Sequence, residues 1–436
     1  MTISPASAQN SRPFYDHLET RDPAQREQAL MAALPGQVAH AQTHATAYSE
    51  LLQGLDARAV NSRAALAALP VTRKADVLAR QQAQRATDAF GGYATVGWSG
   101  MVRQQGVRRV FQSPGPIYEP EGQGADYWRV GRAMFAAGLR AGDLVHNSFS
   151  YHLTPAGSMM EGGAHALGCA VFPGGVGNTD MQLQAAADLR PQAYVGTPSF
   201  LKILLDKAAE QGSGGALSSI RKALVSGEAF PAALRDWLGE RGVAGYQCYA
   251  TADIGLIAYE TAAREGLVLD EGVILEIVRP GSGDPVPDGE VGEIVVTTLN
   301  PDYPLIRFGT GDLSAILPGA CPSGRSNTRI KGWMGRADQS AKVRGMFVHA
   351  SQVAEIARRF PELGRSRLVV EGEMAQDRLS LKVELRAGLS AAPEGLAERL
   401  VQVVRDLTKL RAEVCVLPTG SLPNDGRLIE DLRPLA

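Results

Sequence analysis

The sequence predicts an α/β protein with two domains. The larger, amino-terminal domain is expected to hold mainly parallel sheet layers and a small β-subdomain, and the smaller one to be an α+β domain at the carboxyl end. Three observations support this. The chain has 436 residues, too many for one hydrophobic core. Its middle alternates short apolar strands with helices, as in βαβ units. From residue 336 onward the pattern changes to alternating strands and amphipathic helices.

The first elements along the chain are expected to be helices, because residues 15–90 are rich in alanine and leucine. The parallel sheet is predicted from four short apolar runs in the middle of the chain. They are DLVHNSF (143–149), CAVF (169–172), AYVG (193–196) and RKALV (221–225). The segment MQLQAAADL (181–189) has helical spacing and lies between two of these runs, which predicts a crossover helix.

A change of pattern begins at Val273. The runs VILEIV (273–278) and EIVVTTL (293–299) flank a segment rich in glycine and proline. This arrangement predicts a β-hairpin with a long loop. We therefore expect a small antiparallel subdomain attached to the main sheet.

The carboxyl-terminal domain is predicted to cover residues 336–436, after an amino-terminal domain of residues 1–335. A short strand, AKVRG (341–345), precedes the helix ASQVAEIARRF (350–360). In RLSLKVEL (378–385) every second residue is apolar, as in a strand with one buried face. A helix with an apolar stripe follows, formed by Leu396, Leu400, Val403, Leu407 and Leu410.

Composition excludes several classes of protein. The formal net charge is -2 and no basic run is present, so neither nucleic acid nor an anionic membrane is an expected partner. No apolar segment is long enough to span a membrane, and the first residues do not resemble a secretion signal. Four scattered cysteines show no metal-ligand or redox spacing, and they are expected to pack as small apolar residues in a reducing, cytoplasmic compartment.

The strongest functional motif is PLIRFGTGDL (304–313), followed by GRADQSAKVRG (335–345). Asp312 is expected at the end of a strand, where ligands of open α/β proteins bind. Its carboxylate can accept two hydrogen bonds, which suits the two hydroxyls of a ribose. Arg336 offers a planar set of donors for ribose or phosphate oxygens. Thr310-Gly311-Asp312 alone could be a simple turn, but a turn does not explain the motif that follows.

A second motif, YATADIG, begins at Tyr249. Tyr249 and the small residues Ala250, Thr251 and Ala252 predict a flat surface against which an adenine could stack. Asp253 is a hard oxygen ligand suited to Mg²⁺, although a capping aspartate in an ordinary loop is an equal alternative. The main chain of Ser226, Gly227 and Glu228 could line the other side of the base.

These motifs, in this order, resemble the phenylacetate–CoA ligase family of adenylate-forming enzymes. The resemblance runs from about Asp143 to the end of the chain. It is highly specific for fold and family and much less so for the substrate. The segments that carry it are NSFSYHLTPAG, GNTDMQLQ, VGTPSF, SGEAF, YATADIG, PLIRFGTGDL, the long segment from ACPSGRS to VAEI, and GSLPNDGR.

The resemblance implies a role for each matching residue. Asp312 would bind the ribose, Arg336 the ribose or phosphate, and Glu228 and Tyr249 would frame the adenine. Asp253 would be linked to magnesium. The small domain would be a mobile lid that rotates about Asp338, and Lys342, Arg344 and Gly345 would help to form the face on which the thioester is made. The acyl pocket would be lined by Gly196, Thr197, Pro198, Phe149 and Tyr151, with His152 either a catalytic or gating residue or a packed, hydrogen-bonded histidine.

Two departures from the family pattern concern phosphate chemistry. Adenylate-forming enzymes carry a loop rich in Ser, Thr and Gly that cradles the ATP phosphates and ends near a lysine. The matching segment here is FQSPGPIYEPEG (111–122), which has three prolines, two glutamates and no lysine. Ser113 and Gly115 remain as candidate phosphate ligands. Arg427 stands where the family places its catalytic lysine, with the same charge but a broader, planar head.

The function implied is an ATP-dependent acyl-CoA ligase. It would adenylate an aryl or arylalkyl carboxylic acid with Mg²⁺ and ATP and transfer the acyl group to coenzyme A, and the resemblance suggests a homodimer. Two alternatives stay open. The acceptor could be an amine or a carrier-protein thiol. The chain could instead be a degenerate sensor that binds a nucleotide or acyl-CoA without turnover.

Overall fold

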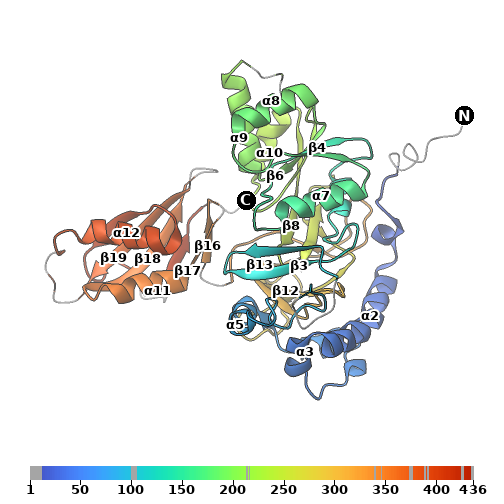
Figure 1. Ribbon diagram of the computed structural model, residues 1–436, viewed down its shortest axis with the longest axis horizontal. Coiled ribbons are helices and arrows are strands. Elements are labelled where there is room, and N and C mark those ends of the chain that lie inside the picture. Colours follow the sequence, from blue (N-terminus) through green and yellow to red (C-terminus); the bar gives the residue numbers. More distant parts are fainter. Residues whose placement is uncertain are drawn as a thin grey trace, which may run out of the picture. The chain divides into compact units, whose positions relative to one another are not determined.

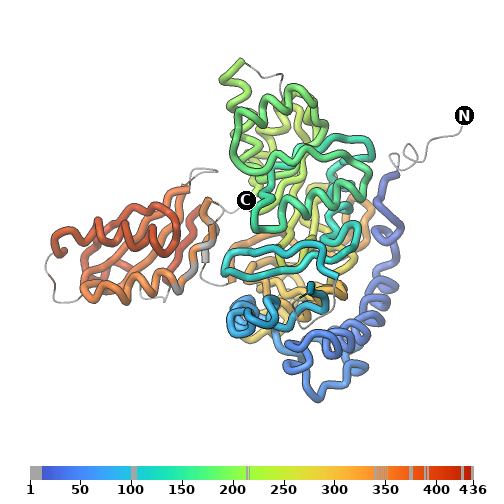
Figure 2. The backbone as a smooth tube through the Cα atoms, viewed as in Figure 1, coloured from blue at the N-terminus to red at the C-terminus, as the bar shows by residue number. Residues whose placement is uncertain are grey.

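The computed structural model describes the two parts of the chain as separate compact units, residues 1–335 and 336–436 (Figures 1 and 2). Its described residues are 12–99, 106–212, 215, 217–337, 340–344, 346–372, 377–386, 389, 392–423 and 427–433. Within them no helix has both the length and the apolar character needed to cross a membrane.

The parallel sheet is the centre of unit 1. Its parallel strands are β4 (Leu144–Asn147), β5 (Ala170–Pro173), β6 (Ala193–Gly196), β7 (Lys222–Val225) and β8 (Ala244–Thr251), in the order β5-β4-β6-β7-β8. The connecting helices are α7 (Ala156–Ala166), α8 (Thr179–Leu189), α9 (Pro198–Glu210) and α10 (Ala232–Glu240). The predicted βαβ layout is thus confirmed, and it brings the carboxyl ends of these strands to one edge of the sheet.

Beyond β8 the same sheet becomes antiparallel. Strand β8 turns back into β9 (Gly255–Glu260), and then follow β10 (Leu267–Leu269), β15 (Arg329–Ile330) and β14 (Ile316–Leu317). The turn between β8 and β9 holds Ala252, Asp253 and Ile254. The predicted adenine-binding segment therefore lies where the sheet changes from parallel to antiparallel pairing.

A second sheet, of order β1-β13-β12-β11, forms the predicted β-subdomain. Strands β11 (Val273–Val278) and β12 (Gly292–Thr298) pair as the expected hairpin, and β13 (Phe308–Ser314) carries the Thr310-Gly311-Asp312 motif. The sequence pattern missed the two-residue strand β1 (Thr72–Arg73), which pairs with β13 in parallel. A two-residue strand has no period to recognise, and its neighbour in the sheet lies more than two hundred positions away in the sequence.

The amino-terminal segment is mostly helical, as expected, apart from β1. Its helices include α2 (Pro23–His44), α3 (Thr46–Leu51), α4 (Arg63–Ala67) and α5 (Lys74–Gln84), with short 3₁₀ turns at His17–Thr20 and Ala57–Ala59. Leu34, Val38 and Tyr48 are fully buried and pack in one core with Ile274 and Phe308 of the second sheet. This core fixes the start of α5 beside β13.

A hairpin of β2 (Arg109–Ser113) and β3 (Ile117–Glu121) stands where the phosphate loop was sought, and α6 (Gly131–Ala136) follows it. The loop is thus replaced by a regular two-stranded element with its turn at residues 114–116. Ile117 is fully buried, which anchors the hairpin on the body of unit 1.

Unit 2 is the predicted α+β domain. It contains the hairpin β16 (Ser340–Val343) and β17 (Met346–His349), and a sheet of order β20-β19-β18-β21. That sheet consists of β18 (Leu363–Glu371), β19 (Arg378–Leu385), β20 (Glu413–Leu417) and β21 (Ile429–Asp431), with α11 (Ala350–Arg359) and α12 (Leu396–Thr408) packed on it. Helix α12 ends before Leu410, which is buried in the same core from the following loop.

Candidate active site

Three strand ends build one wall of the candidate site. Strand β6 ends at Gly196, and Thr197 then caps α9 by accepting a hydrogen bond from Phe200 N at 3.4 Å, with Pro198 in the first turn. Threonine and proline are favoured at these two positions, because one fills the cap and the other needs no hydrogen-bonded N–H. Gly196 is required by crowding, since a Cβ there would lie 2.1 Å from Tyr194 Oη.

The next strand end carries Ser226, Gly227 and Glu228. Ser226 Oγ donates to the Cys248 carbonyl at 2.8 Å, which ties the end of β7 to β8. Glu228 is exposed, and its Oε1 accepts from Ser199 N in the first turn of α9 at 2.7 Å. A carboxylate is favoured at that position because the helix N-terminus carries partial positive charge. The structure thus places two of the predicted segments side by side.

Tyr249 connects this edge with the second sheet. Its hydroxyl donates to Asp312 Oδ2 at 2.7 Å, although the two residues belong to different sheets. Trp333 Nε1 donates to Asp312 Oδ1 at 3.0 Å. A carboxylate has about four acceptor positions, so these two bonds do not exhaust the capacity of Asp312. The sequence did not point to Trp333, because an isolated tryptophan in a loop carries no motif.

The main chain around Asp312 is held by its neighbours in β12 and β1. Thr310 Oγ1 donates to the Ile294 carbonyl at 2.9 Å, and Gly311 has a φ of +74°, a conformation that favours glycine. Glu293 accepts from Gly311 N at 3.3 Å and from Arg73 Nη1 at 2.5 Å. Asp312 itself is 8 % exposed. The carboxylate therefore sits rigidly just below the surface, which suits binding of a sugar.

Asp253 pairs with a residue that sequence reasoning missed. Lys74, the first residue of α5, donates from Nζ to Asp253 Oδ2 at 3.0 Å. The Lys74 side chain is 38 % exposed and that of Asp253 only 2 %. The other oxygen of Asp253, Oδ1, is buried and has no hydrogen-bond partner among the described residues. Nothing in the sequence links positions 74 and 253, because α5 reaches this place through the pairing of β1 with β13 and the bonds of Gln81 to Tyr118 in β3.

Comparison with known proteins identifies the relatives of this chain. Residues 138–300 match the family model described as AMP-binding enzyme. A phenylacetate–coenzyme A ligase from Thermus thermophilus is 30% identical over 424 residues, covering 88% of this chain and 92% of the relative. Another, from Aromatoleum evansii, is 31% identical over 376 residues and 82% of each chain.

The chain belongs to the phenylacetate–coenzyme A ligase family. It is therefore a ligase of the adenylate-forming kind. A solved structure with a similar fold is a 2-hydroxyisobutyryl-CoA ligase in complex with an acyl-AMP and CoA. It is 25% identical, with a TM-score of 0.81, covering 99% of this chain and 94% of that chain.

In this ligase the phosphate-loop segment differs from the expected cradle. Ser113 donates from both its backbone N and its Oγ to the Glu119 carboxylate, the first at 3.2 Å. Gly115 lies exposed in the turn of the hairpin. The two donors of Ser113 are therefore already engaged. The glutamates do not project toward solvent either, because Glu119 is fully buried and Glu121 pairs with Arg109 at 2.8 Å.

Glu119 lies close to the Lys74–Asp253 pair. Burial is the largest cause that raises the pKa of Glu119, to about 8, and the Asp253 charge raises it further. Lys74 and the hydrogen bonds from Ser113 act in the opposite direction. The buried carboxyl groups of Glu119 and Asp253 therefore both interact with the Lys74 ammonium. The gain or loss of a proton or a cation at this place changes the net charge of the three groups together.

The predicted acyl-pocket residues of the ligase differ in accessibility. Phe149 is buried in the core, and Tyr151 is partly buried, with its hydroxyl donating to Glu161 Oε2 and accepting from Asn147 Nδ2, both at 2.8 Å. His152 is exposed and shows no side-chain hydrogen bond within the described residues. The interpretation of His152 as a packed, hydrogen-bonded histidine is therefore wrong. It stands in an irregular segment before α7, where its ring meets solvent.

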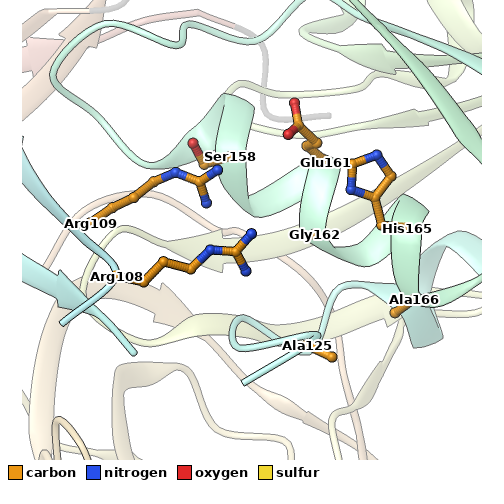
Figure 3. A pocket seen from close by; sticks show the side chains of 8 residues that line it. All are labelled: Arg108, Arg109, Ala125, Ser158, Glu161, Gly162, His165 and Ala166. Atoms are coloured by element: carbon orange, nitrogen blue, oxygen red, sulfur yellow. The ribbon is translucent and has the colours of Figure 1, made fainter. Parts of the chain in front are cut away.

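A separate cavity of about 250 Å³ opens between the start of β2 and helix α7 (Figure 3). Arg108 and Arg109 reach into it from the hairpin side, opposite Glu161 and His165 on α7. None of the predicted site residues lines this cavity. The hydrogen bond from Tyr151 to Glu161 links it to the predicted acyl pocket.

The remaining predicted residues of the ligase lie in unit 2. Arg344 is exposed and bonded to Asp377, from its N to Oδ2 at 3.2 Å and from Nη2 to the carbonyl at 2.8 Å. Arg427 is exposed, and its carbonyl accepts from Arg367 Nε at 3.2 Å. Lys342 lies in β16 and Arg336 is the first residue of the unit. Asp338 and Gly345 lie outside the described residues.

Proposed function

We propose that this ligase activates an aryl or arylalkyl carboxylic acid with ATP and passes the acyl group to coenzyme A. The observation that carries the proposal is the Tyr249–Asp312–Trp333 arrangement at the edge where three parallel strands end. It offers a rigid carboxylate for a ribose beside an aromatic ring for a base. The relatives named phenylacetate–coenzyme A ligase supply the reaction class.

The first step is an in-line displacement at the α-phosphorus. An oxygen of the substrate carboxylate forms a bond to that phosphorus, the bond to the bridging oxygen breaks, and pyrophosphate leaves with the electron pair. No proton transfer is needed, so the protein contributes positioning and charge stabilisation. Asp312 holds the sugar, Tyr249 and the segment from Ser226 to Glu228 hold the base, and Arg427 offsets charge on the α-phosphate.

Magnesium is the expected companion of the triphosphate. Within the described residues no group of three His, Cys, Asp or Glu side chains is arranged to hold a metal ion, and Mg²⁺ commonly uses one or two carboxylates together with phosphates and water. Asp253 fits this mode, because its Oδ1 is a buried acceptor without a described partner. Bound Mg²⁺ would neutralise phosphate charge at this position.

In the second step the sulfur of coenzyme A, having lost its proton, attacks the acyl carbon. The bond from that carbon to the phosphate oxygen breaks and AMP leaves with the electron pair. We propose that unit 2 turns about Asp338 between the steps, as a hinge. Lys342, Arg344 and Gly345 would then serve the thioester-forming arrangement, and Arg336 would contact ribose or phosphate.

The substrate class rests on the relatives and on the acyl-pocket residues. Phe149, Tyr151 and the segment Gly196–Thr197–Pro198 supply apolar and aromatic surface, which suits a ring-bearing acid. His152 is proposed as a gating residue at the exposed end of this pocket. Assays with acids that differ only in their ring substituents would show which shapes the predicted acyl pocket accepts.

The test is a panel of aryl, arylalkyl and short aliphatic acids assayed for ATP-dependent pyrophosphate release, with hydroxylamine to trap the acyl-adenylate. The proposal expects pyrophosphate release with phenylacetate-like acids. Without hydroxylamine, AMP formation should continue only when coenzyme A is added. An amine or a carrier-protein thiol that replaces coenzyme A would establish the other acceptor. Pyrophosphate release with no acid in the panel would contradict adenylation.

A second candidate is a nucleotide or acyl-CoA sensor without turnover. It is favoured by the hairpin β2–β3, whose Ser113 donors are bound to Glu119, and by Arg427 in place of lysine. Calorimetry that finds AMP or acyl-CoA binding, combined with no pyrophosphate release from the wild type or from Arg427→Lys, would establish this candidate.

A further inference from the structure

The hairpin β2–β3 leaves the ATP phosphates without a cation of their own. Between residues 109 and 121 the only basic side chain is Arg109, and it is paired with Glu121. Pro114, Pro116 and Pro120 have no N–H to donate. If this ligase uses ATP as proposed, a basic side chain for the β- and γ-phosphates has to come from outside this hairpin.

Lys74 is positioned to do so by the pairing of β1 with β13. The parallel register sets Thr72 opposite Phe308 and Arg73 opposite Gly309. Lys74 follows directly as the first residue of α5, so it begins beside the strand that carries the ribose-binding motif. The ion pair of Arg73 with Glu293, which also accepts from Gly311 N, fixes this register.

The side chain of Lys74 reaches the other nucleotide motif. Its Nζ lies 3.0 Å from Asp253 Oδ2, in the turn that follows Tyr249. Tyr249 in turn is bonded to Asp312. Lys74 therefore connects the segment proposed for the ribose with the segment proposed for magnesium.

The Lys74 side chain is more exposed to a ligand than that of its partner Asp253. The lysine side chain is 38 % exposed, whereas Asp253 is 2 % exposed and keeps Oδ1 buried without a described partner. Lys74 also begins the 11-residue helix α5, whose N-terminus has no side-chain cap. The positive end of that helix adds to the charge of the ammonium.

We propose that Lys74 binds the β- and γ-phosphates of ATP and replaces the lysine that the phosphate hairpin lacks. This proposal rests on the proposed adenylation function. In the absence of nucleotide, Asp253 holds the ammonium in position. When ATP binds, the ammonium contacts the phosphate oxygens, and Asp253 can contribute its carboxylate to the accompanying magnesium ion. The ammonium then offsets the charge that builds on pyrophosphate as it leaves.

The experiment compares binding of AMP with binding of α,β-methylene-ATP, in the presence of Mg²⁺, by calorimetry of the full chain. Lys74→Ala is expected to weaken binding of the ATP analogue by about 10- to 100-fold, which is the range for loss of a hydrogen bond to a charged group. AMP, which lacks the β- and γ-phosphates, is expected to bind as in the wild type. Lys74→Arg keeps the charge and should recover part of the affinity for the analogue.

Two further variants distinguish a role of Lys74 in phosphate binding from a role in supporting the fold. Lys74→Gln keeps a donor for Asp253 but has no charge, so it should behave like Lys74→Ala toward the ATP analogue while unfolding at the wild-type temperature. The matched control is Lys222→Ala. Lys222 also pairs with an aspartate, Asp143, at 2.7 Å, but at the amino ends of the parallel strands, and its loss should change neither affinity.

Three outcomes overturn the proposal. If the ATP analogue binds Lys74→Ala and Lys74→Gln as tightly as the wild type, Lys74 does not contact the phosphates. If the Lys74 variants bind AMP and the ATP analogue with equally reduced affinity, the lysine only supports the fold of the site. If the wild type binds neither nucleotide, the proposed function fails first, and the inference falls with it.

Discussion

Tyr249 Oη donates a 2.7 Å hydrogen bond to Asp312 Oδ2 across two different sheets. The bond joins the end of β8 in the large sheet to β13 in the β-subdomain. An aromatic ring and a fixed carboxylate therefore stand together before any ligand binds. Preorganised groups of this kind lower the cost of ordering the site when the nucleotide arrives.

Substitution of Asp312 by alanine should weaken AMP binding by about 10- to 100-fold, because hydrogen bonds to a charged group are worth about 1.5–3 kcal/mol. Tyr249→Phe should cost less, about 2- to 10-fold, since it removes one neutral donor that orients Asp312. Calorimetric titration with AMP measures both effects. Binding to Asp312→Ala with the wild-type affinity would show that the ribose lies elsewhere.

Loss of the buried Glu119 carboxyl should change the pH dependence of stability. Because its pKa is raised from 4.5 to about 8 in the folded chain, the native state binds more protons than the unfolded state between these values. Its contribution to stability is therefore present below pH 4.5 and is lost as pH rises to 8, with a slope of at most about 1.4 kcal/mol per pH unit. Glu119→Gln removes this slope.

The measurement for Glu119 is urea unfolding of the full chain at several values between about pH 5 and pH 8.5, a range that spans the titration of this carboxyl. Glu119→Gln should gain stability relative to the wild type as pH rises. Glu121→Gln is the matched control, because the native Glu121 carboxylate is paired with Arg109. A constant difference between Glu119→Gln and the wild type across this range would contradict the assignment.

Arg427→Ala should slow adenylation by on the order of 100-fold, as expected when one donor to developing charge is removed. ATP binding should stay within about threefold, since ground-state contacts are retained. Single-turnover formation of the acyl-adenylate separates the rate of adenylation from the affinity for ATP. Arg358→Ala serves as the control, because Arg358 lies in an exposed ion pair of the same unit. An equal loss of adenylation rate in both variants would show that Arg427 has no specific role.

Arg307 is expected to be the most sensitive charged position in the core of unit 1. It is 2 % exposed and holds Glu276 with two hydrogen bonds of 3.0 and 3.1 Å, and it also donates to the carbonyls of Ala67 and Gly283. Arg307→Met leaves Glu276 buried without its partner, which should cost about 3–5 kcal/mol. The double variant Arg307→Met with Glu276→Leu should recover part of this loss in urea unfolding, whereas a single variant as stable as the wild type would contradict the argument.

Local patterns were sufficient for much of the fold. The period of apolar residues predicted four of the parallel strands, β4 to β7, the hairpin of β11 and β12, and strands β16 and β19 of unit 2. Each of these elements has its own repeat and its own turn residues, and none depends on distant partners to be recognised. Strand β1 and the regular hairpin β2–β3 escaped this reasoning, because two-residue strands and proline-rich segments lack a period.

The residues of the candidate site also fall into two groups, those that motifs could predict and those that only the structure revealed. Asp312, Tyr249 and Ser226 through Glu228 could be named from motifs. The expectation that Asp312 ends its strand was wrong, because β13 continues to Ser314, where it still pairs with Gly292 of β12. Trp333 and Lys74 could not be named, because each reaches the site only through pairing between distant segments. The motif around Ser113 indicated the right segment, but the buried bond from Ser113 to Glu119 determines which of its donors remain for a ligand.

The sequence by itself determined the family, the parallel strands β4 to β7, the hairpin of β11 and β12, and the motifs that hold Asp312, Tyr249 and Ser226. These follow from local periodicity and from motifs that keep their spacing. Only the tertiary structure decided that Lys74 meets Asp253, that Trp333 and Tyr249 share Asp312, and that Glu119 is buried with a raised pKa. The physical reason is that charge and hydrogen bonding depend on distance and on exclusion of water, and both are set by contacts between residues remote in the chain.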